Sequence, residues 1–209
     1  MHKLLTSRDM ARISCRACNG CGECCRGMDD TIHLDPYDIF MLCKNLKKSF
    51  SDLMNVRIGL HVDEGLVLPY LLMRGDNICC TFLGDNGRCR IHSFRPGFCR
   101  LFPLGREYDG TGFRYFVTED GCNMPGKSKV RIDRWLEIPD LKRYETFISQ
   151  WHYFLKSLRE KLYASQDAEM NQRVSLFVLE MFFERPYNFS GDFYEQFARR
   201  LELAEEALS

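Results

Sequence analysis

The sequence opens with a dense run of cysteines. Five of the 11 cysteines in this 209-residue chain fall between positions 15 and 25, and no backbone needs thiols at this density in order to fold. Such a run indicates a metal site, an iron–sulfur cluster or redox chemistry. Two residues separate each successive pair up to Cys24, a spacing that lets neighbouring thiolates turn toward one centre. The run comprises Cys15, Cys18, Cys21, Cys24 and Cys25.

A second group of cysteines is spread between positions 79 and 122 and is interrupted by turn residues. The Asp-Asn-Gly turn at 85–87 is predicted to fold Cys80 back toward Cys89. The Pro-Gly bend at 96–97 is predicted to present Cys99. This second group comprises Cys79, Cys80, Cys89, Cys99 and Cys122.

Arginines and histidines lie close to these cysteines in the sequence. A thiolate-rich centre carries negative charge, and Arg90, Arg95 and Arg100 are predicted to offset it and to donate hydrogen bonds to sulfur. The alternative is that all three are ordinary surface arginines. His92 and His33 are possible metal ligands, although we interpret them as polar residues near the site.

Taken in order, these motifs resemble the CxxCxxCC family, also called the YkgJ-like cysteine cluster family, which is described as zinc- or iron-chelating. The resemblance rests on Cys-Asn-Gly-Cys-Gly-Glu-Cys-Cys ending at Cys25, on Gly-Arg-Cys89, on Arg-Pro-x-x-Cys99-Arg-x-Phe-Pro, and on the late Cys122. It covers roughly residues 15 to 125. It implies eight metal ligands: Cys18, Cys21, Cys24, Cys25, Cys80, Cys89, Cys99 and Cys122.

The sequence leaves alternatives open for the ligand set, the metal and the function. Cys15 and Cys79 are extra to the family pattern, and either could replace a family ligand. Eight thiolates make two four-ligand sites, or one cluster with spare thiols. A C-x2-C-x2-C triplet with a remote fourth partner favours a 4Fe-4S cluster, whereas zinc sites usually combine two separate cysteine pairs. The expected function is therefore a protein with one or two 4Fe-4S clusters in electron transfer, or the cluster-dependent partner of an enzyme.

Two further functions compete with this expectation. One is a structural zinc module that contacts an unknown protein partner through its helices. The other is an iron–sulfur protein-modifying enzyme, since flagellin lysine methylase has a related cysteine motif. The sequence contains no Gly-rich nucleotide fingerprint and no Ser-His-Asp arrangement, so whether the protein is an enzyme stays open and no catalytic residue is identified.

Composition excludes several classes of partner. Lys plus Arg and Asp plus Glu number 29 each, which argues against a broad basic face for nucleic acid. No apolar run is long enough to span a membrane, and the first ten residues lack a secretory apolar region. We therefore expect a cytoplasmic protein, in a compartment that keeps thiols reduced.

The elements that must position the cysteines indicate an α+β fold. A composition break predicts a cysteine-rich, metal- or iron–sulfur-binding domain over 1–125 and a helical segment over 126–209 that packs on it. A helix is expected from Asp35 to Lys48, with Cys43 on its apolar face as a buried structural thiol. Short antiparallel strands are expected at 66–73, 78–82, 88–91 and 113–118, and further helices at 140–163, 167–183 and about 190–207.

Overall fold

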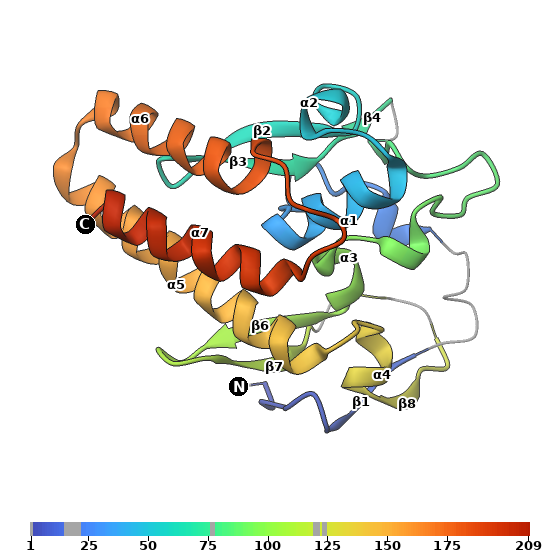
Figure 1. Cartoon of the computed structure of the whole chain (residues 1–209). Coiled ribbons are helices and arrows are strands. Elements are labelled where there is room, and N and C mark those ends of the chain that lie inside the picture. The colour runs from blue at the N-terminus through green and yellow to red at the C-terminus, as the bar shows by residue number, and fades with distance from the viewer. Residues whose placement is uncertain (1, 15–21, 76–77, 119–121, 123–124) are drawn as a thin grey trace.

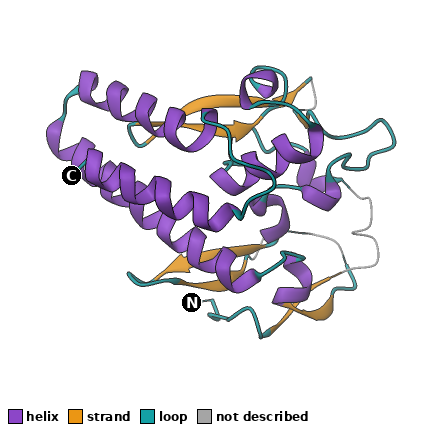
Figure 2. Cartoon of the chain, in the orientation of Figure 1, coloured by secondary structure: helices purple, strands orange, loops and turns teal. Residues whose placement is uncertain are grey.

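The computed structural model of this chain describes residues 2–14, 22–75, 78–118, 122 and 125–209. Short antiparallel strand pairs make up much of the first part, and the part after residue 140 is helical (Figures 1 and 2). The predicted α+β fold with a helical C-terminal part is therefore confirmed. Within the described ranges, no helix has the length and apolar character needed to traverse a lipid bilayer.

The strands pair two by two. The expected strands at 66–73 and 113–118 are confirmed, and the one at 78–82 shrinks to two residues. The strand expected at 88–91 is wrong, because the chain makes one isolated bridge between Leu83 and Cys89 and then turns into the short helix η3 (His92–Phe94). The pairs are β1 (Met10–Ser14) with β8 (Ser128–Arg131), β2 (Ile58–Asp63) with β3 (Leu66–Leu71), β4 (Met73–Arg74) with β5 (Cys79–Cys80), and β6 (Leu104–Tyr108) with β7 (Phe113–Val117).

The four longest helices follow the predicted order, and three short α-helices, Phe50–Leu53, Gly97–Leu101 and Ile132–Leu136, were not predicted. The helix after Asp35 ends one residue before a left-handed Lys47, and the long helices begin and end close to their predicted limits. Asp140 does not cap with its side chain, because its backbone is left-handed (φ 48°) and its carboxylate instead lies 3.8 Å from Arg143. The helices are η2 (Glu23–Cys25), α1 (Pro36–Leu46), α2 (Phe50–Leu53), α3 (Gly97–Leu101), α4 (Ile132–Leu136), α5 (Leu141–Ser165), α6 (Ala168–Leu179), the π-helical turn η4 (Glu180–Glu184) and α7 (Phe193–Ala207).

One aromatic core joins the long helices to α1. Phe147 of α5 meets Phe197 of α7 edge to face, with ring centroids 4.6 Å apart, and Phe193 of α7 lies 5.2 Å from Phe40 of α1. The aromatic stripes predicted as core are thus buried. Both this core and the β1–β8 pair include residues from each side of position 125. The division into units 1–125 and 126–209 stays a prediction.

Helices α1 and α2 both begin with a capping box, one of them buried and the other exposed. Asp38 and Asp52 are the third residues of α1 and α2, and each closes a capping box with the residue before its helix. Asp38 is buried and also accepts a hydrogen bond of 2.7 Å from the backbone N–H of Gly97, whereas Asp52 is exposed. Burial raises the pKa of Asp38 to about 6, while hydrogen bonds from Ser49 lower the pKa of Asp52.

We expect Asp38→Asn and Asp52→Asn to show opposite pH dependence. The pKa of Asp38 in the folded protein is raised from its ordinary 3.8 to about 6, so its favourable contribution exists below pH 3.8 and is lost as pH rises through 6. Relative to the wild type, Asp38→Asn should therefore gain about 2 kcal/mol of unfolding free energy between pH 4 and pH 7. Asp52→Asn should instead lose stability over the same interval, because a lowered pKa stabilises the charged form.

Urea unfolding of the three proteins at pH 4, 5, 6 and 7 measures both slopes. Because Asp52→Asn changes the same residue at the same helix position, it controls for the loss of a capping carboxylate. If stability changed with pH in the same direction for both variants relative to the wild type, the raised pKa of Asp38 would be contradicted.

Candidate metal centre

The structure brings five cysteine thiols from four segments into one cluster. The thiol of Cys25 is in hydrogen-bonding contact with those of Cys24 and Cys89. Cys80 and Cys99 lie close enough for their charges to act on this group. We call these five residues the thiol centre: Cys24 and Cys25 on η2, Cys80 on β5, Cys89 in the following loop and Cys99 on α3.

The thiols of the centre differ in how readily they ionise. Hydrogen bonding with Cys25 lowers the pKa of Cys24 to about 7 and the pKa of Cys89 to about 6, while the same contacts raise the pKa of Cys25. Burial raises the pKa of Cys80 and, more strongly, the pKa of Cys99. Thiolate is the form that binds metals, so Cys24 and Cys89 are the sulfurs closest to that form near neutral pH.

A tight loop places the first four members of the centre, Cys24, Cys25, Cys80 and Cys89. The predicted turn is present, since Gly84 donates a 2.9 Å hydrogen bond to the carbonyl of Arg88, and this brings Cys89 back beside Cys80. Gly22 precedes Cys24 in a left-handed conformation (φ 68°), and a side chain there would overlap the carbonyl of Gly87. The Gly22 position therefore lets η2 lie directly on the loop that carries Cys89.

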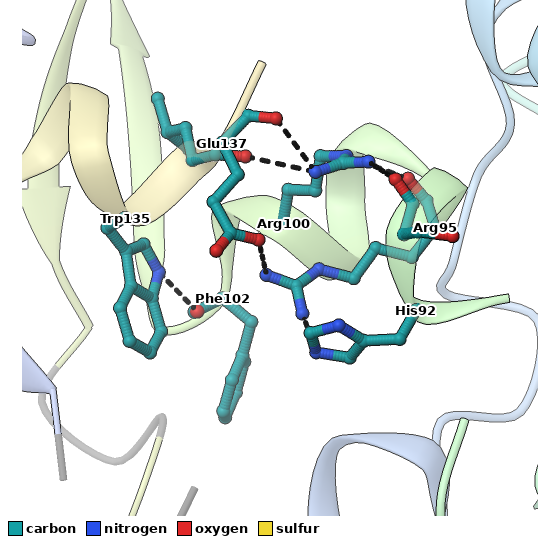
Figure 3. A network of polar contacts seen from close by, with 8 residues as sticks. His92, Arg95, Arg100, Phe102, Trp135 and Glu137 are labelled. Atoms are coloured by element: carbon teal, nitrogen blue, oxygen red, sulfur yellow. Dashed lines mark hydrogen bonds and ion pairs between the residues drawn. The ribbon is translucent and has the colours of Figure 1, made fainter. Parts of the chain in front are cut away.

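Cys99 is positioned by hydrogen bonds around the short helix α3. The N-terminal end of α3 is held to α1 by the Gly97–Asp38 hydrogen bond of 2.7 Å. The carbonyl of Phe102, just after α3, accepts a hydrogen bond of 3.0 Å from the indole nitrogen of Trp135 on α4 (Figure 3). Helix α3 is thus fastened at both ends to neighbouring helices.

Arg100 fastens α3 in the middle. Its guanidinium is buried, with 8% of the residue exposed, and it donates to four backbone carbonyls (Figure 3). The prediction that Arg100 donates to sulfur is therefore wrong, because its donors go to backbone oxygen. The acceptors are Ser93 at 2.6 Å, Arg95 at 3.0 Å, Glu137 at 3.0 Å and Leu136 at 3.3 Å.

The other basic residues take different positions. Arg95 lies between the Glu137 carboxylate, at 3.6 Å, and the His92 ring (Figure 3), and its charge adds to the Cys25 hydrogen bonds in lowering the pKa values of Cys24 and Cys89. Arg95 therefore acts electrostatically on the centre as expected. Arg90 is exposed and lies 3.6 Å from Asp85.

Sequence reasoning missed one arginine, and its interpretation of the two histidines as polar neighbours of the site stays a prediction. Arg26 Nη1 lies 3.1 Å from the sulfur of Cys79, and residues 26 and 79 also form a backbone bridge. The signal was the position of Arg26 directly after the cysteine run. His92 contacts Arg95, and His33 packs edge-on against the His61 ring at 4.8 Å.

The remaining predicted ligands are less completely described. Cys15, Cys18 and Cys21 lie outside the described residues. Cys122 is described, and its backbone carbonyl is approached by the Lys127 ammonium. Cys43 is buried on α1, and burial raises its pKa to about 11, so its prediction as a structural thiol is confirmed.

The chemistry of the assembled donors fits a soft metal. Within the part of the chain that the structure describes, no group of three or more His, Cys, Asp or Glu side chains is already arranged around a metal-ion position. The thiol centre nonetheless gathers sulfur atoms only, and thiolates are the ligands of both zinc and iron–sulfur clusters. The donor set therefore suits either group.

A cavity of about 570 Å³ opens beside the thiol centre. Cys24 and Cys99 form part of its wall, and most of the other lining side chains are apolar. At one side the His2 ring stacks on Phe116 with ring centroids 4.2 Å apart. Two thiols of the centre are thus adjacent to an apolar hollow. Its apolar lining comprises Met28, Ile32, Phe98, Phe102, Leu104, Phe116 and Val117.

We expect Arg100→Lys to lower the free energy of unfolding by about 2 to 4 kcal/mol, because lysine cannot replace the fork that serves four buried carbonyls. Arg90→Lys is the matched control and should change the free energy of unfolding by less than about 0.5 kcal/mol, since Arg90 is exposed and its ion pair is with the exposed Asp85. Urea unfolding measures both. Equal effects of the two substitutions would contradict the bracing role of Arg100.

Comparison with known protein families adds a direct match. Residues 17–123 match the model of the CxxCxxCC family, described as "Putative zinc- or iron-chelating domain". Searches of curated proteins and of solved structures give no match. The matched segment spans half of the chain and contains every member of the thiol centre. The chain therefore belongs to the CxxCxxCC family of zinc- or iron-chelating domains.

Proposed function

We propose that this protein carries one or two 4Fe-4S clusters and serves in electron transfer, or as the cluster-bearing partner of an enzyme. Family membership already makes it a metal-binding protein. The observation that carries the finer proposal is the thiol centre, in which sulfurs from four segments meet and Cys24 and Cys89 have lowered pKa values. The C-x2-C-x2-C spacing that leads into this centre is typical of cubane clusters.

The ligand set that we propose extends beyond the thiol centre. Five ligands belong to the centre itself, and the other three are the family cysteines at 18, 21 and 122. When bound, a 4Fe-4S cluster supplies a one-electron redox centre. The eight proposed ligands are Cys18, Cys21, Cys24, Cys25, Cys80, Cys89, Cys99 and Cys122.

The protein supplies charge and shelter around these sulfurs. Arg95 has only 15% of its side chain exposed. The thiolates of Cys24 and Cys89 are favoured mainly by hydrogen bonds with Cys25, and the positive charge of Arg95 adds a smaller contribution. Cys80 is buried, so one side of the centre is shielded from water. Burial and positive charge both act on the potential of a cluster.

We further propose a cytoplasmic protein that meets a protein partner or redox enzyme. Reduced thiols persist in the cytoplasm, which suits a centre built from free sulfurs. The balanced charge of the chain, 29 basic against 29 acidic residues, disfavours nucleic acid as the partner. The apolar hollow beside Cys24 and Cys99 gives such a partner a place to approach the centre.

Anaerobic purification followed by elemental analysis and electron paramagnetic resonance tests the proposal. We expect iron and acid-labile sulfide in equal amounts, absorbance near 400 nm, and a paramagnetic signal after reduction with dithionite. About four or eight irons per chain would distinguish one cluster from two. Stoichiometric zinc without iron or sulfide would overturn the iron–sulfur proposal and identify a zinc-binding domain.

A pair of cysteine variants tests the ligand assignment. Cys89→Ala should weaken metal binding at least tenfold, because loss of a direct ligand costs no less than loss of an outer-shell partner. Cys43→Ala should leave metal content unchanged and cost about 1 kcal/mol of stability, since this thiol is buried on the apolar face of α1. Metal per chain, measured on matched anaerobic preparations, compares the two. Equal metal loss in both variants would contradict the assignment of Cys89.

A further inference from the structure

A second cavity, of about 420 Å³, is lined in part by α1 and includes no member of the thiol centre. We call it the α1–η4 pocket, because it is bounded by the second half of α1, the start of α2, the π-helical turn η4 and the loop after η4. In Figure 1 this orange-red loop passes across α1 before α7 begins. The Phe40 ring lies 5.7 Å from Phe189, and the Phe50 ring lies 6.1 Å from Phe183. The apolar lining comprises Ile39, Phe40, Cys43, Phe50, Phe183, Pro186, Tyr187 and Phe189.

The rim of the α1–η4 pocket is positively charged. Four basic side chains line it, and Glu184 is the single acid among the described lining residues. All four cations are exposed, and within the described part of the chain none of them lies within 4 Å of a carboxylate. The chain as a whole has a net charge of zero, so this is a local concentration of charge. The four are Lys44, Lys47, Lys48 and Arg185.

One wall of the pocket is rigidly built. A π-helical turn is a rare conformation that occurs often at functional sites, and here it carries Phe183 and Glu184. The buried guanidinium of Arg200 donates to the carbonyls of Met181 and Arg185 at 2.8 Å each, and to that of Pro186 at 2.7 Å. The wall is therefore held open by α7 before any ligand arrives.

We propose that the α1–η4 pocket binds a small anionic amphiphile, with its apolar part on the aromatic floor and its carboxylate or phosphate among the rim lysines. The volume falls within the range of ordinary ligand pockets. Burial of an apolar chain against the aromatic floor is favourable, because it removes apolar surface from water. The rim cations favour a negative head group and disfavour a positive one.

Calorimetric titration of the intact, as-purified protein with three probes tests this proposal. Sodium octanoate carries both the apolar chain and the negative head. Acetate lacks the chain, and octyltrimethylammonium has the opposite charge. We expect saturable binding of one octanoate per chain and no saturable binding of the other two.

Two sets of variants locate the site. The triple variant Lys44→Gln, Lys47→Gln, Lys48→Gln should weaken octanoate binding about tenfold, because each exposed charge contributes on the order of 0.5 kcal/mol. Removal of three charges elsewhere, with Lys3→Gln, Lys129→Gln and Lys142→Gln, should leave the Kd within about twofold. Phe189→Ser, at a residue that is 41% exposed, should weaken binding without changing the charge of the pocket.

Several results would overturn the proposal. These are equal binding of octanoate and octyltrimethylammonium, equal loss of binding in the two triple variants, and the absence of octanoate binding. Lysine-dependent binding of phosphatidylglycerol vesicles or of polyglutamate without octanoate binding would also overturn it, because the lysines would then serve a membrane or an acidic protein. Circular dichroism shows whether each variant is folded.

Discussion

The buried guanidinium of Arg100 is the interaction on which the cysteine region depends most. It is surrounded by four backbone carbonyls from two segments, 93–95 and 136–137, and among the described residues it forms no ion pair with a carboxylate. Burying such a charge is unfavourable unless its donors are satisfied, so the segments that supply the carbonyls are held in one arrangement. Because α3 carries both Arg100 and Cys99, that arrangement also fixes one sulfur of the thiol centre.

The strand pairs of the front half need similar support from the helices. A two-stranded sheet is marginally stable alone. Ser175 of α6 accepts a hydrogen bond of 3.1 Å from Val67 of β3, and Tyr153 of α5 contacts the tip of the β6–β7 hairpin through Gly110 and Gly112, at 2.7 and 2.9 Å. Figure 1 shows α6 beside β3 and α5 beside the β6–β7 hairpin. One hydroxyl from a helix thus anchors each of these two hairpins, β2–β3 and β6–β7.

The four longest helices were predictable from the sequence, whereas the short helices α2, α3 and α4, the strands β1, β2, β6 and β8 and the arginine roles were not. The apolar spacing of α5 and the Asp35–Pro36 start of α1 are local signals that packing did not override. Strands β2 and β6 were missed because Gly59 and Gly105 interrupt them. Each glycine faces an aromatic ring of its paired strand, Tyr70 or Phe116, and a side chain at the glycine would overlap that ring. Only the paired strand reveals why glycine is suitable there.

The candidate site was also predictable only in part. The turn at 85–87 was enough to predict that Cys80 and Cys89 approach each other, because the turn and both residues are close in sequence. The role of Arg100 was not predictable, because its acceptors at 136 and 137 lie far along the chain. Spacing identifies which sulfurs can meet, but it does not identify which cations face them.

The pairing of β1 with β8 has a consequence for how the family segment at 17–123 can vary. Ser14, just before the family segment at 17–123, is the register partner of Ser128, just after it. The chain therefore enters and leaves this segment at one place, where β1 and β8 are paired. Because both ends of the segment are held at that one place, insertions between them need not displace the paired strands or the helices that follow.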